Sequence, residues 1–205
     1  MNKITIIYTY YGQKERLGGI IKEKHPEARV VIVDDGHPDP CPKLHGIDVY
    51  RIEEDIPWNQ PGARNLGFQE SDGWIVCADI DHLVTKGNVK KLLDLDKRKG
   101  TIYYLGREDT DSWNIYMIHK DDFEKIGGYD EDFCGHYGYD DTLFNLMAQK
   151  NLKVEQVRNI KARVFAKESS SKLERDYAFN QELLKHSLHL TCNEHKRINF
   201  KWHKV

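Results

Sequence analysis

Short apolar runs alternate with longer polar stretches through the first hundred residues. Two runs, at 30–33 and 74–78, are continuously apolar, which is typical of strands that helices cover on both faces. The alternation predicts a parallel sheet with crossover helices, and therefore an α/β fold. The predicted strands cover residues 3–9, 29–34, 48–51, 73–78 and 101–106, and the predicted helices cover 14–23, 62–70 and 88–95.

The second half of the chain continues the pattern less regularly. We predict a strand at 113–119, a short helix, a glycine-rich loop from 127, and a helix at 140–150. A helix is then expected from the serine run at 169–171 to His189, followed by a basic tail with a frayed end. We assign residues 1–167 to one domain, with halves at 1–106 and 107–167, and residues 168–205 to a charged, helical extension.

Composition narrows the class of protein. The 205 residues suit a single domain. Charged residues make up 31% of the chain but nearly cancel at net −2, so nonspecific nucleic-acid binding is not favoured. No run approaches the roughly 18 apolar residues of a membrane span, and the N-terminus lacks the pattern of a signal peptide, so a cytoplasmic protein is expected. The basic tail leaves peripheral membrane contact open.

The four cysteines carry no sign of a structural cluster. They are scattered without CxxC spacing, so neither a zinc cluster nor a disulfide framework is implied, and reduced thiols are expected.

The strongest chemical signal is the motif Asp79-Ile80-Asp81, which directly follows an apolar strand. Side chains two positions apart on an extended segment share one face, so the two carboxylates lie together. Hard divalent cations such as Mg²⁺ and Mn²⁺ prefer oxygen ligands and commonly bridge carboxylates to phosphates. The motif therefore indicates a metal site, although a solvated acidic turn is the alternative when it is taken alone.

Polar residues also follow the other strands of the predicted sheet. Asp34-Asp35-Gly36 offers acceptors for a base or a ribose, while an Asx-type turn is the alternative. Thr9-Tyr10-Tyr11 offers aromatic faces for stacking on a base, while core packing is the alternative. Ligands of such sheets bind beyond the carboxyl ends of the strands, which is where these residues fall.

Two further segments carry candidate groups. Arg64 lies near the start of a predicted helix, where its planar guanidinium could pair with a phosphate or simply face solvent. Asp140 follows a glycine-rich, acidic loop at the start of another helix. It is placed either to cap that helix or to remove a proton from an acceptor hydroxyl.

Four motifs in this order resemble the GT-A glycosyltransferases. The N-terminal half resembles the family 2 enzymes, and the second half resembles the C-terminal region of the β-1,4-galactosyltransferases. The likeness spans about residues 3–167. It rests on Val33-Asp34-Asp35-Gly36, Ala63-Arg64-Asn65-Leu66-Gly67, Ala78-Asp79-Ile80-Asp81, and Gly127-Gly128-Tyr129-Asp130-Glu131 with Gly138-Tyr139-Asp140-Asp141.

The resemblance implies a single GT-A domain with a mixed, mainly parallel sheet and a role for each matching residue. Residues 1–106 would bind the nucleotide and residues 107–167 the acceptor. Asp79 and Asp81 would hold Mn²⁺ or Mg²⁺ beside the donor, with Asp81 as the preferred direct ligand. Asp140 would be the general base, and Tyr139 and Asp141 would bind the acceptor sugar. The nucleotide-sugar contacts implied are Thr9 and Tyr11 at the nucleotide, Asp34 or Asp35 at uracil or ribose, and Arg64, Asn65 and Asp79 towards the diphosphate.

The chain departs from the galactosyltransferase pattern at two places. A Glu commonly precedes the base in those proteins, and here Tyr139 holds that position, which leaves the sugar unspecified. Those proteins also carry a histidine metal ligand downstream, whereas residues 161–167 contain none. Lys167 could supply some of the missing positive charge, so the sequence leaves the metal site weaker or even dispensable.

The function predicted from the resemblance is metal-dependent, inverting transfer of a hexose from a UDP-sugar to a saccharide or another hydroxyl acceptor. The hexose would be of the galactose, N-acetylgalactosamine or glucose type. One alternative is a nucleotidyltransferase acting on sugar phosphates, although residues 10–15 are too poor in glycine to form its phosphate loop. The other is a noncatalytic module that binds a nucleotide sugar, because a fold does not fix a function.

Overall fold

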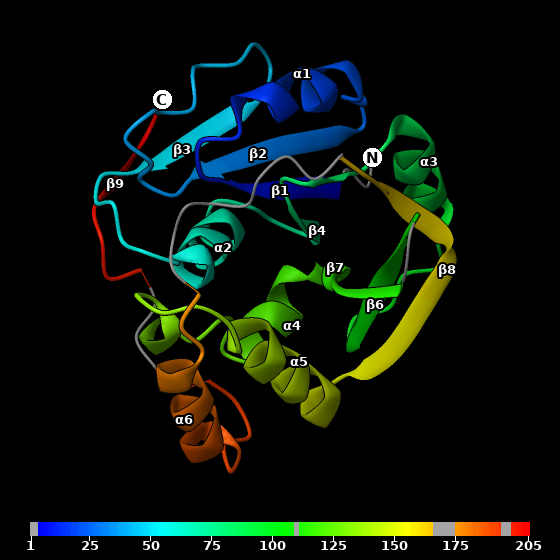
Figure 1. Cartoon of the computed structure of the whole chain (residues 1–205). Helices are drawn as coiled ribbons and strands as arrows, with labels where there is room; N and C mark the ends of the chain where they lie inside the picture. Colours follow the sequence, from blue (N-terminus) through cyan, green and yellow to red (C-terminus); the bar gives the residue numbers. More distant parts are fainter. Residues whose placement is uncertain (1–3, 109–110, 166–174, 194–197) are drawn as a thin grey trace.

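A mixed sheet with helices on both faces forms the centre of the molecule (Figure 1). The computed structural model describes residues 4–108, 111–165, 175–193 and 198–205. Within these residues nine strands pair in the order β5-β8-β6-β7-β4-β1-β2-β3-β9. Four neighbouring strands are parallel, as the first hundred residues predict: β1 (Ile4–Tyr10), β2 (Ala28–Asp34), β3 (Asp48–Ile52) and β4 (Trp74–Asp79).

The remaining strands extend this parallel unit on both sides. Strand β7 pairs antiparallel with β4 and with β6, and β8 pairs parallel with β6. Two short antiparallel strands, β5 and β9, form the edges beside β8 and β3. The bounds are β5 (His82–Leu83), β6 (Thr101–Arg107), β7 (Asp111–His119), β8 (Lys153–Val164) and β9 (Trp202–Lys204).

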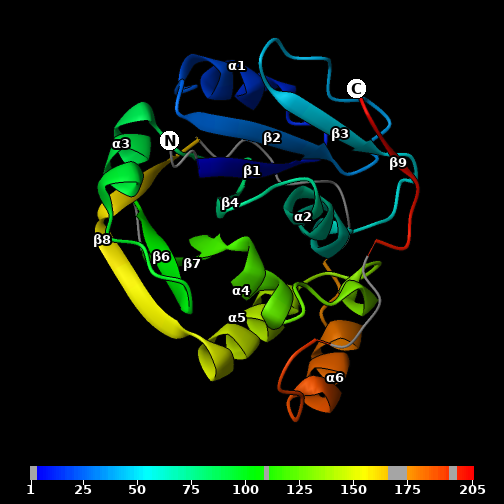
Figure 2. The same cartoon turned by 180° about the vertical axis from the view of Figure 1, so that it is seen from behind.

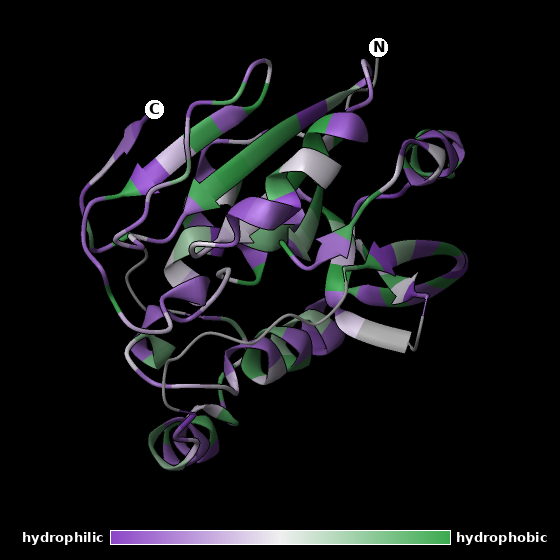
Figure 3. Ribbon diagram, turned by 45° about the horizontal axis from the view of Figure 1, so that its top comes forward, coloured by the Kyte–Doolittle hydropathy of each residue, from purple (hydrophilic) through white to green (hydrophobic). Residues whose placement is uncertain are grey.

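The sheet separates two hydrophobic cores. Helices α1 (Lys14–Lys22) and α3 (Lys86–Asp94) cover one face, and α2 (Gln60–Gln69), α4 (Lys120–Lys125) and α5 (Asp140–Asn151) cover the other. Figures 1 and 2 show these two layers from opposite sides. In Figure 3 the hydrophobic stretches concentrate on the strands, while hydrophilic positions mark the outer helices. Burial on both faces explains why the central strands are continuously apolar.

Close packing holds α2 against the sheet. A Cβ atom added at Gly67 would lie 2.6 Å from Cγ2 of Ile7, so only glycine allows the helix to approach β1 this closely. Arg64 lies about one turn earlier on the same helix. The glycine contact therefore fixes the helix that carries this arginine at the sheet.

Most of the predicted elements are confirmed, with boundaries that differ by a few residues. The sequence analysis missed β8, whose charged residues mask its buried Val157 and Ile160, and the short strand β5. The expected frayed C-terminal end is wrong for β9, which pairs with β3 and places Trp202 opposite Ile52. Pairing with an edge strand satisfies backbone groups that a three-residue segment cannot satisfy alone.

The charged extension contains the helix α6 (Ala178–Ser187), which is shorter than the helix expected from 169 to 189. The predicted start of that helix lies outside the described residues. All four cysteines are free thiols, as expected. Among the described helices, none has the length and apolar character needed to cross a bilayer.

Candidate functional site

The strand ends predicted to carry chemistry meet at one edge of the sheet. The parallel register places Thr9 of β1 beside Asp79 of β4, and Tyr10 of β1 beside Asp34 of β2. The carboxyl ends of the three strands therefore bring the residues of three separate motifs together, as expected for an α/β sheet.

Arg64 is the centre of the charged part of the site. Its side chain is fully buried, and Nη2 donates a hydrogen bond to Oδ1 of Asp79 at 2.7 Å. Nη1 donates to Oδ1 of Asp141 and lies 3.5 Å from Oδ2 of Asp140. The guanidinium carbon also lies 4.8 Å from the centre of the Tyr129 ring. The buried guanidinium of Arg64 thus joins Asp79, at the end of β4, to the two aspartates in the first turn of α5.

Asp140 has the electrostatic environment of a general base. Burial raises the pKa of its carboxyl group to about 7, and the neighbouring Asp141 carboxylate adds to the increase while Arg64 opposes it. Its side chain is 11% exposed, so it keeps access to solvent. A group with a pKa near the operating pH is the most effective proton acceptor, so Asp140 is suited to deprotonate a hydroxyl.

The loop that precedes Asp140 is held by helix α6. Asn180 is fully buried, and its Nδ2 lies at hydrogen-bond distance, 2.8–3.0 Å, from the carbonyl oxygens of Phe133, His136 and Gly138. Tyr139 then adopts a left-handed conformation, with φ of 66°, at the start of α5. The sequence analysis missed Asn180, because nothing in a charged helix distinguishes a docked asparagine from a solvated one.

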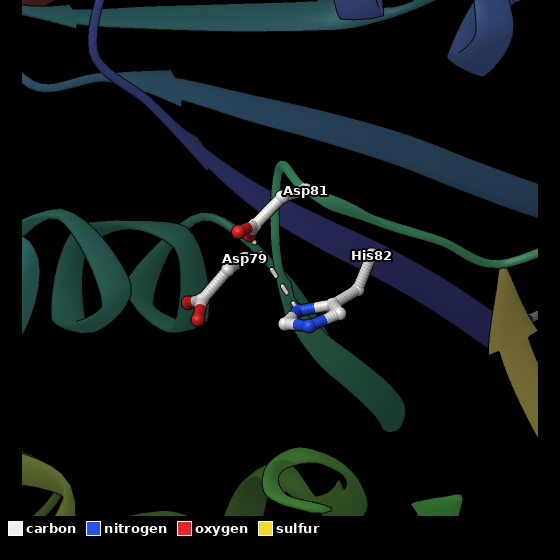
Figure 4. Close-up of side chains that lie close together, drawn as sticks. All are labelled: Asp79, Asp81 and His82. Carbon is white, nitrogen blue, oxygen red and sulfur yellow. Dashed lines mark ion pairs between the residues drawn. The ribbon is translucent and has the colours of Figure 1, made fainter. Parts of the chain in front are cut away.

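Three side chains at the end of β4 form a candidate metal centre. Ligand atoms of Asp79, Asp81 and His82 all lie within 4.8 Å of one another (Figure 4). His82 is 4% exposed, and its Nδ1 is buried without a hydrogen-bond partner in the described part of the chain. Two carboxylates beside an imidazole nitrogen that makes no hydrogen bond are a suitable donor set for a divalent cation of the Mn²⁺ type.

Sequence reasoning missed His82 because it looked for a histidine only in residues 161–167. Residues 164 and 165 of that segment in fact lie alongside the candidate metal centre. Val164 pairs with His82, and the backbone N–H of Phe165 donates a hydrogen bond to the carbonyl oxygen of Asp81 at 3.0 Å. The position of His82 directly after the Asp79-Ile80-Asp81 motif was the available signal. Lys167 lies outside the described residues.

The two aspartates after β2 are held by protein groups. Asp34 is fully buried, and its Oδ2 accepts hydrogen bonds from the Cys41 backbone N–H at 2.8 Å and from Nη1 of Arg51 at 2.6 Å. Asp35 is 6% exposed and accepts a hydrogen bond from Nδ2 of Asn59 at 2.9 Å. Both aspartates order the loop after β2, and their predicted contact with uracil or ribose stays a prediction.

Thr9 and Tyr11 are the other two residues predicted to contact the nucleotide. Thr9 is 9% exposed, and Tyr11 is partly exposed. The Tyr11 hydroxyl donates a hydrogen bond to Oδ1 of Asp55 at 2.9 Å, and its ring meets that of His37 edge to face at 4.7 Å between centroids. Tyr11 therefore presents an aromatic side chain near the end of β1, and the predicted nucleotide contacts of Thr9 and Tyr11 stay predictions.

Asn65 has a structural role in the loop that follows α4. Its Nδ2 donates hydrogen bonds to the Tyr129 carbonyl oxygen and to Oε1 of Glu131, each at 2.9 Å, and its Oδ1 accepts one from the Tyr129 N–H. Glu131 in turn accepts hydrogen bonds from the backbone N–H groups of Ile198 and Asn199. Asn65 thus ties the loop and the C-terminal segment to α2, and its predicted support of a diphosphate remains a prediction.

Comparison with known proteins identifies the family of most of the chain. Residues 6–150 match the model of the family described as glycosyl transferase family 2. No curated protein matches the chain significantly.

Solved structures of two kinds of glycosyltransferase share the fold. The catalytic domain of Drosophila β1,4-galactosyltransferase 7, in complex with xylobiose, superposes with a TM-score of 0.63 at 13% identity, over 97% of this chain and 84% of that one. A mutant of the same Drosophila enzyme, with manganese, UDP-Gal and xylobiose, gives 0.57 at 15% identity over the same shares of the two chains. GalNAc-T7 with UDP, GalNAc and Mn²⁺ gives 0.61 at 13% identity, over 80% of this chain and 44% of that one.

The family match covers the strand ends, Arg64 and Asp140, which together form the charged site described above. The fold of the solved structures extends the likeness through nearly the whole chain. The chain therefore belongs to glycosyl transferase family 2 and is a glycosyltransferase of the GT-A fold.

Proposed function

We propose that this enzyme transfers a hexose from a UDP-sugar to a saccharide or another hydroxyl acceptor, with a divalent cation bound and with inversion at the anomeric carbon. The hexose is of the galactose, N-acetylgalactosamine or glucose type. The solved enzymes of the same fold that contain UDP-Gal with manganese, or UDP with GalNAc and Mn²⁺, support the nature of the donor.

One observation carries the proposal. The buried guanidinium of Arg64 lies 2.7 Å from Asp79 at the end of β4 and 3.5 Å from Asp140 at the start of α5. A donor diphosphate placed at the strand ends and an acceptor hydroxyl placed at α5 therefore lie on either side of the same charged cluster. Such an arrangement suits direct displacement between two bound substrates, because no covalent intermediate is needed.

The chemistry requires one proton acceptor and one site for departing negative charge. Asp140 removes the proton of the acceptor hydroxyl as its oxygen forms the new bond to the anomeric carbon. The bond from that carbon to the diphosphate oxygen breaks on the opposite side, so the configuration inverts. A cation held by Asp79 and Asp81 would supply neutralisation of the charge that develops on the diphosphate. Arg64 contacts both Asp79 and Asp140 and so fixes the position of each relative to the other.

An aromatic group beside Asp140 supports a saccharide as the acceptor. Four aromatic side chains from three segments of the chain pack against one another here: Trp58, Tyr137, Tyr139 and Tyr177. Their rings meet edge to face or tilted, with centroids 4.5–6.2 Å apart. Tyr177 is 48% exposed. Sites for small ligands commonly combine aromatic walls with a few polar groups, and a sugar ring presents C–H faces to such walls. Tyr139 and Asp141 would then contact the acceptor, as the sequence predicts.

A thermal-shift panel tests the donor. The enzyme is heated with UDP-galactose, UDP-N-acetylgalactosamine and UDP-glucose, each with and without Mn²⁺. A ligand at a hundred times its Kd stabilises the folded state by about 2.7 kcal/mol. For a chain of this size that corresponds to a rise of roughly 5–10 °C. At least one donor is expected to give such a rise only in the presence of the metal.

Three variants separate the roles. Asp81→Ala should abolish the metal-dependent shift, Asp140→Asn should keep the shift but lose transfer to a panel of saccharides, and Asp72→Asn should change neither. Asp72 is a suitable control because its side chain is 97% exposed and it precedes β4, at the opposite end of that strand from Asp79. Proton NMR of the product linkage then reports inversion. No shift with any donor at millimolar concentration, or full transfer by Asp140→Asn, would contradict the proposal.

A further inference from the structure

We propose that His82 is the third protein ligand of the metal centre, through Nδ1, and that this nitrogen makes the centre prefer Mn²⁺ to Mg²⁺. The inference rests on the proposed metal-dependent function and concerns the same site. It assigns a role to a buried side chain that the reaction itself does not use.

The first observation is the unsatisfied nitrogen. His82 is 4% exposed, and Nδ1 is buried without a hydrogen-bond partner among the described residues. Leaving a buried polar atom without a hydrogen-bond partner destabilises a protein. Figure 4 shows the imidazole ring beside the two aspartates, with Nδ1 facing Asp81. A cation between these groups would accept the free lone pair and remove that cost.

The second observation excludes the simplest alternative, a hydrogen-bonded pair of histidine and aspartate. The distance from Nδ1 of His82 to Oδ1 of Asp81 is 3.6 Å, which is too long for a hydrogen bond. It is, however, a suitable separation for two ligand atoms of one ion, since Mn²⁺ is bound at about 2.0–2.3 Å from each. The ligand atoms of all three residues lie within 4.8 Å of one another, so small side-chain movements bring them onto one ion.

The backbone around His82 is held in place without a metal. His82 pairs with Val164 in the β5–β8 ladder, and the Phe165 N–H donates to the Asp81 carbonyl oxygen at 3.0 Å. Two residues after His82, the Val84 N–H donates to the Tyr8 hydroxyl oxygen at 3.1 Å. The site is therefore largely preorganised, and little conformational entropy is lost when an ion binds.

Two arginines lie beside the carboxylates of the candidate metal centre. Nη1 of Arg16 lies 3.9 Å from Oδ2 of Asp81, and Arg64 donates to Oδ1 of Asp79. These two arginines offset the carboxylate charges without pairing with the imidazole. His82 thus has no neighbouring group among the described residues whose hydrogen bond would compete for Nδ1.

The chemistry of the donor set leads to the metal preference. Mg²⁺ strongly prefers oxygen ligands, whereas Mn²⁺ accepts an imidazole nitrogen beside carboxylates. Replacing the imidazole nitrogen with an amide oxygen at a similar position should therefore weaken the binding of Mn²⁺ more than the binding of Mg²⁺. His82→Asn makes that exchange, because the Asn Oδ1 lies at the same distance along the side chain as Nδ1.

Electron paramagnetic resonance of bound Mn²⁺ tests the inference directly. Titration of the enzyme with Mn²⁺ in the presence of UDP gives the affinity, and pulsed measurements on the same sample detect a nitrogen nucleus bound to the ion. We expect a directly bound ¹⁴N in the native enzyme, which changes to the ¹⁵N pattern when histidine is labelled. His82→Asn should lose that signal and bind Mn²⁺ about tenfold more weakly, with Mg²⁺ affinity changed by less than about twofold.

A matched control and the native spectrum keep the outcomes distinct. His203→Asn, at a half-exposed position on β9, should keep both the nitrogen signal and the affinity. If Mn²⁺ binds the native enzyme without a histidine nitrogen, the inference is overturned while the proposed function stands. If Mn²⁺ does not bind even with UDP present, metal-dependent transfer itself fails. The native spectrum decides the question even if His82→Asn does not fold.

Discussion

Replacing the candidate base with its neutral isostere should stabilise the enzyme at alkaline pH while removing its activity. Burial raises the pKa of the Asp140 carboxyl group from about 3.8 to about 7 in the folded protein. Between these two pH values the folded state keeps a proton that the unfolded state has lost. The contribution of Asp140 to stability is therefore complete below about pH 4 and is lost as the pH rises through about 7.

The size of the effect on stability follows from this shift of the Asp140 pKa. A tenfold change in the proton dissociation constant is worth about 1.36 kcal/mol, so the charged Asp140 destabilises the folded state by up to about 4 kcal/mol above pH 7. The side chain is 11% exposed and can relax towards solvent, which reduces the effect. We expect Asp140→Asn to be more stable than the native enzyme by about 2 kcal/mol at pH 8 and by less than about 0.5 kcal/mol at pH 4.5.

Urea denaturation at these two pH values, with a reductant to protect the thiols, measures the difference. Asp48→Asn is the control with the opposite sign. Burial opposes ionisation of Asp48, but hydrogen bonds from Lys204 and Arg29 prevail and lower its pKa. Its stabilising effect is present at pH 8 and lost as the pH falls, so Asp48→Asn should destabilise the protein at pH 8 by up to about 1 kcal/mol.

The result that would refute the reasoning is a stability difference between Asp140→Asn and the native enzyme that does not change with pH. That outcome would mean that the charge on Asp140 does not destabilise the folded protein. The pKa of Asp140 would then not be raised towards the value that suits a general base. A variant that gains stability at pH 8 and keeps full transfer would instead separate the buried charge from catalysis.

Four further predictions concern the site and its supports. The rate of transfer should rise about tenfold for each pH unit up to about 7 and then level off, as measured by a pH profile of kcat/KM, because Asp140 must be ionised to act as a base. Arg64→Leu should destabilise the protein by about 3–5 kcal/mol in urea denaturation, since three carboxylates lose their buried partner. Asn180→Ala should lower kcat while sparing UDP binding by calorimetry, because the loop before α5 loses its hydrogen bonds; an unchanged kcat would contradict this. Gly36→Ala should cost about 1–3 kcal/mol, since φ is 73° and the new Cβ would lie 2.1 Å from a carbonyl oxygen, whereas Gly18→Ala, with open space around it, should not destabilise the protein.

Sequence reasoning predicted the positions of the candidate site better than the contacts within it. Asp79 and Asp140 were recognised because each follows an element with a clear pattern, a buried strand or a glycine-rich loop before a helix. Arg64 was expected to face either a phosphate or solvent, and in the structure its buried guanidinium pairs with three protein carboxylates. A sequence shows which groups are charged, but it does not show which of them share one buried space.

The sequence by itself determined the α/β class, the order of most elements and the strand ends that carry acidic groups. Hydrophobic periodicity and turn residues act over a few neighbouring positions, so they can be read locally. Only the tertiary structure decided the strand β8, the edge strand β9, the docking of Asn180, and the orientation of His82 beside Asp79 and Asp81. Each of these depends on partners dozens of residues away along the chain, and the free energy of such contacts is gained only when the chain packs them together.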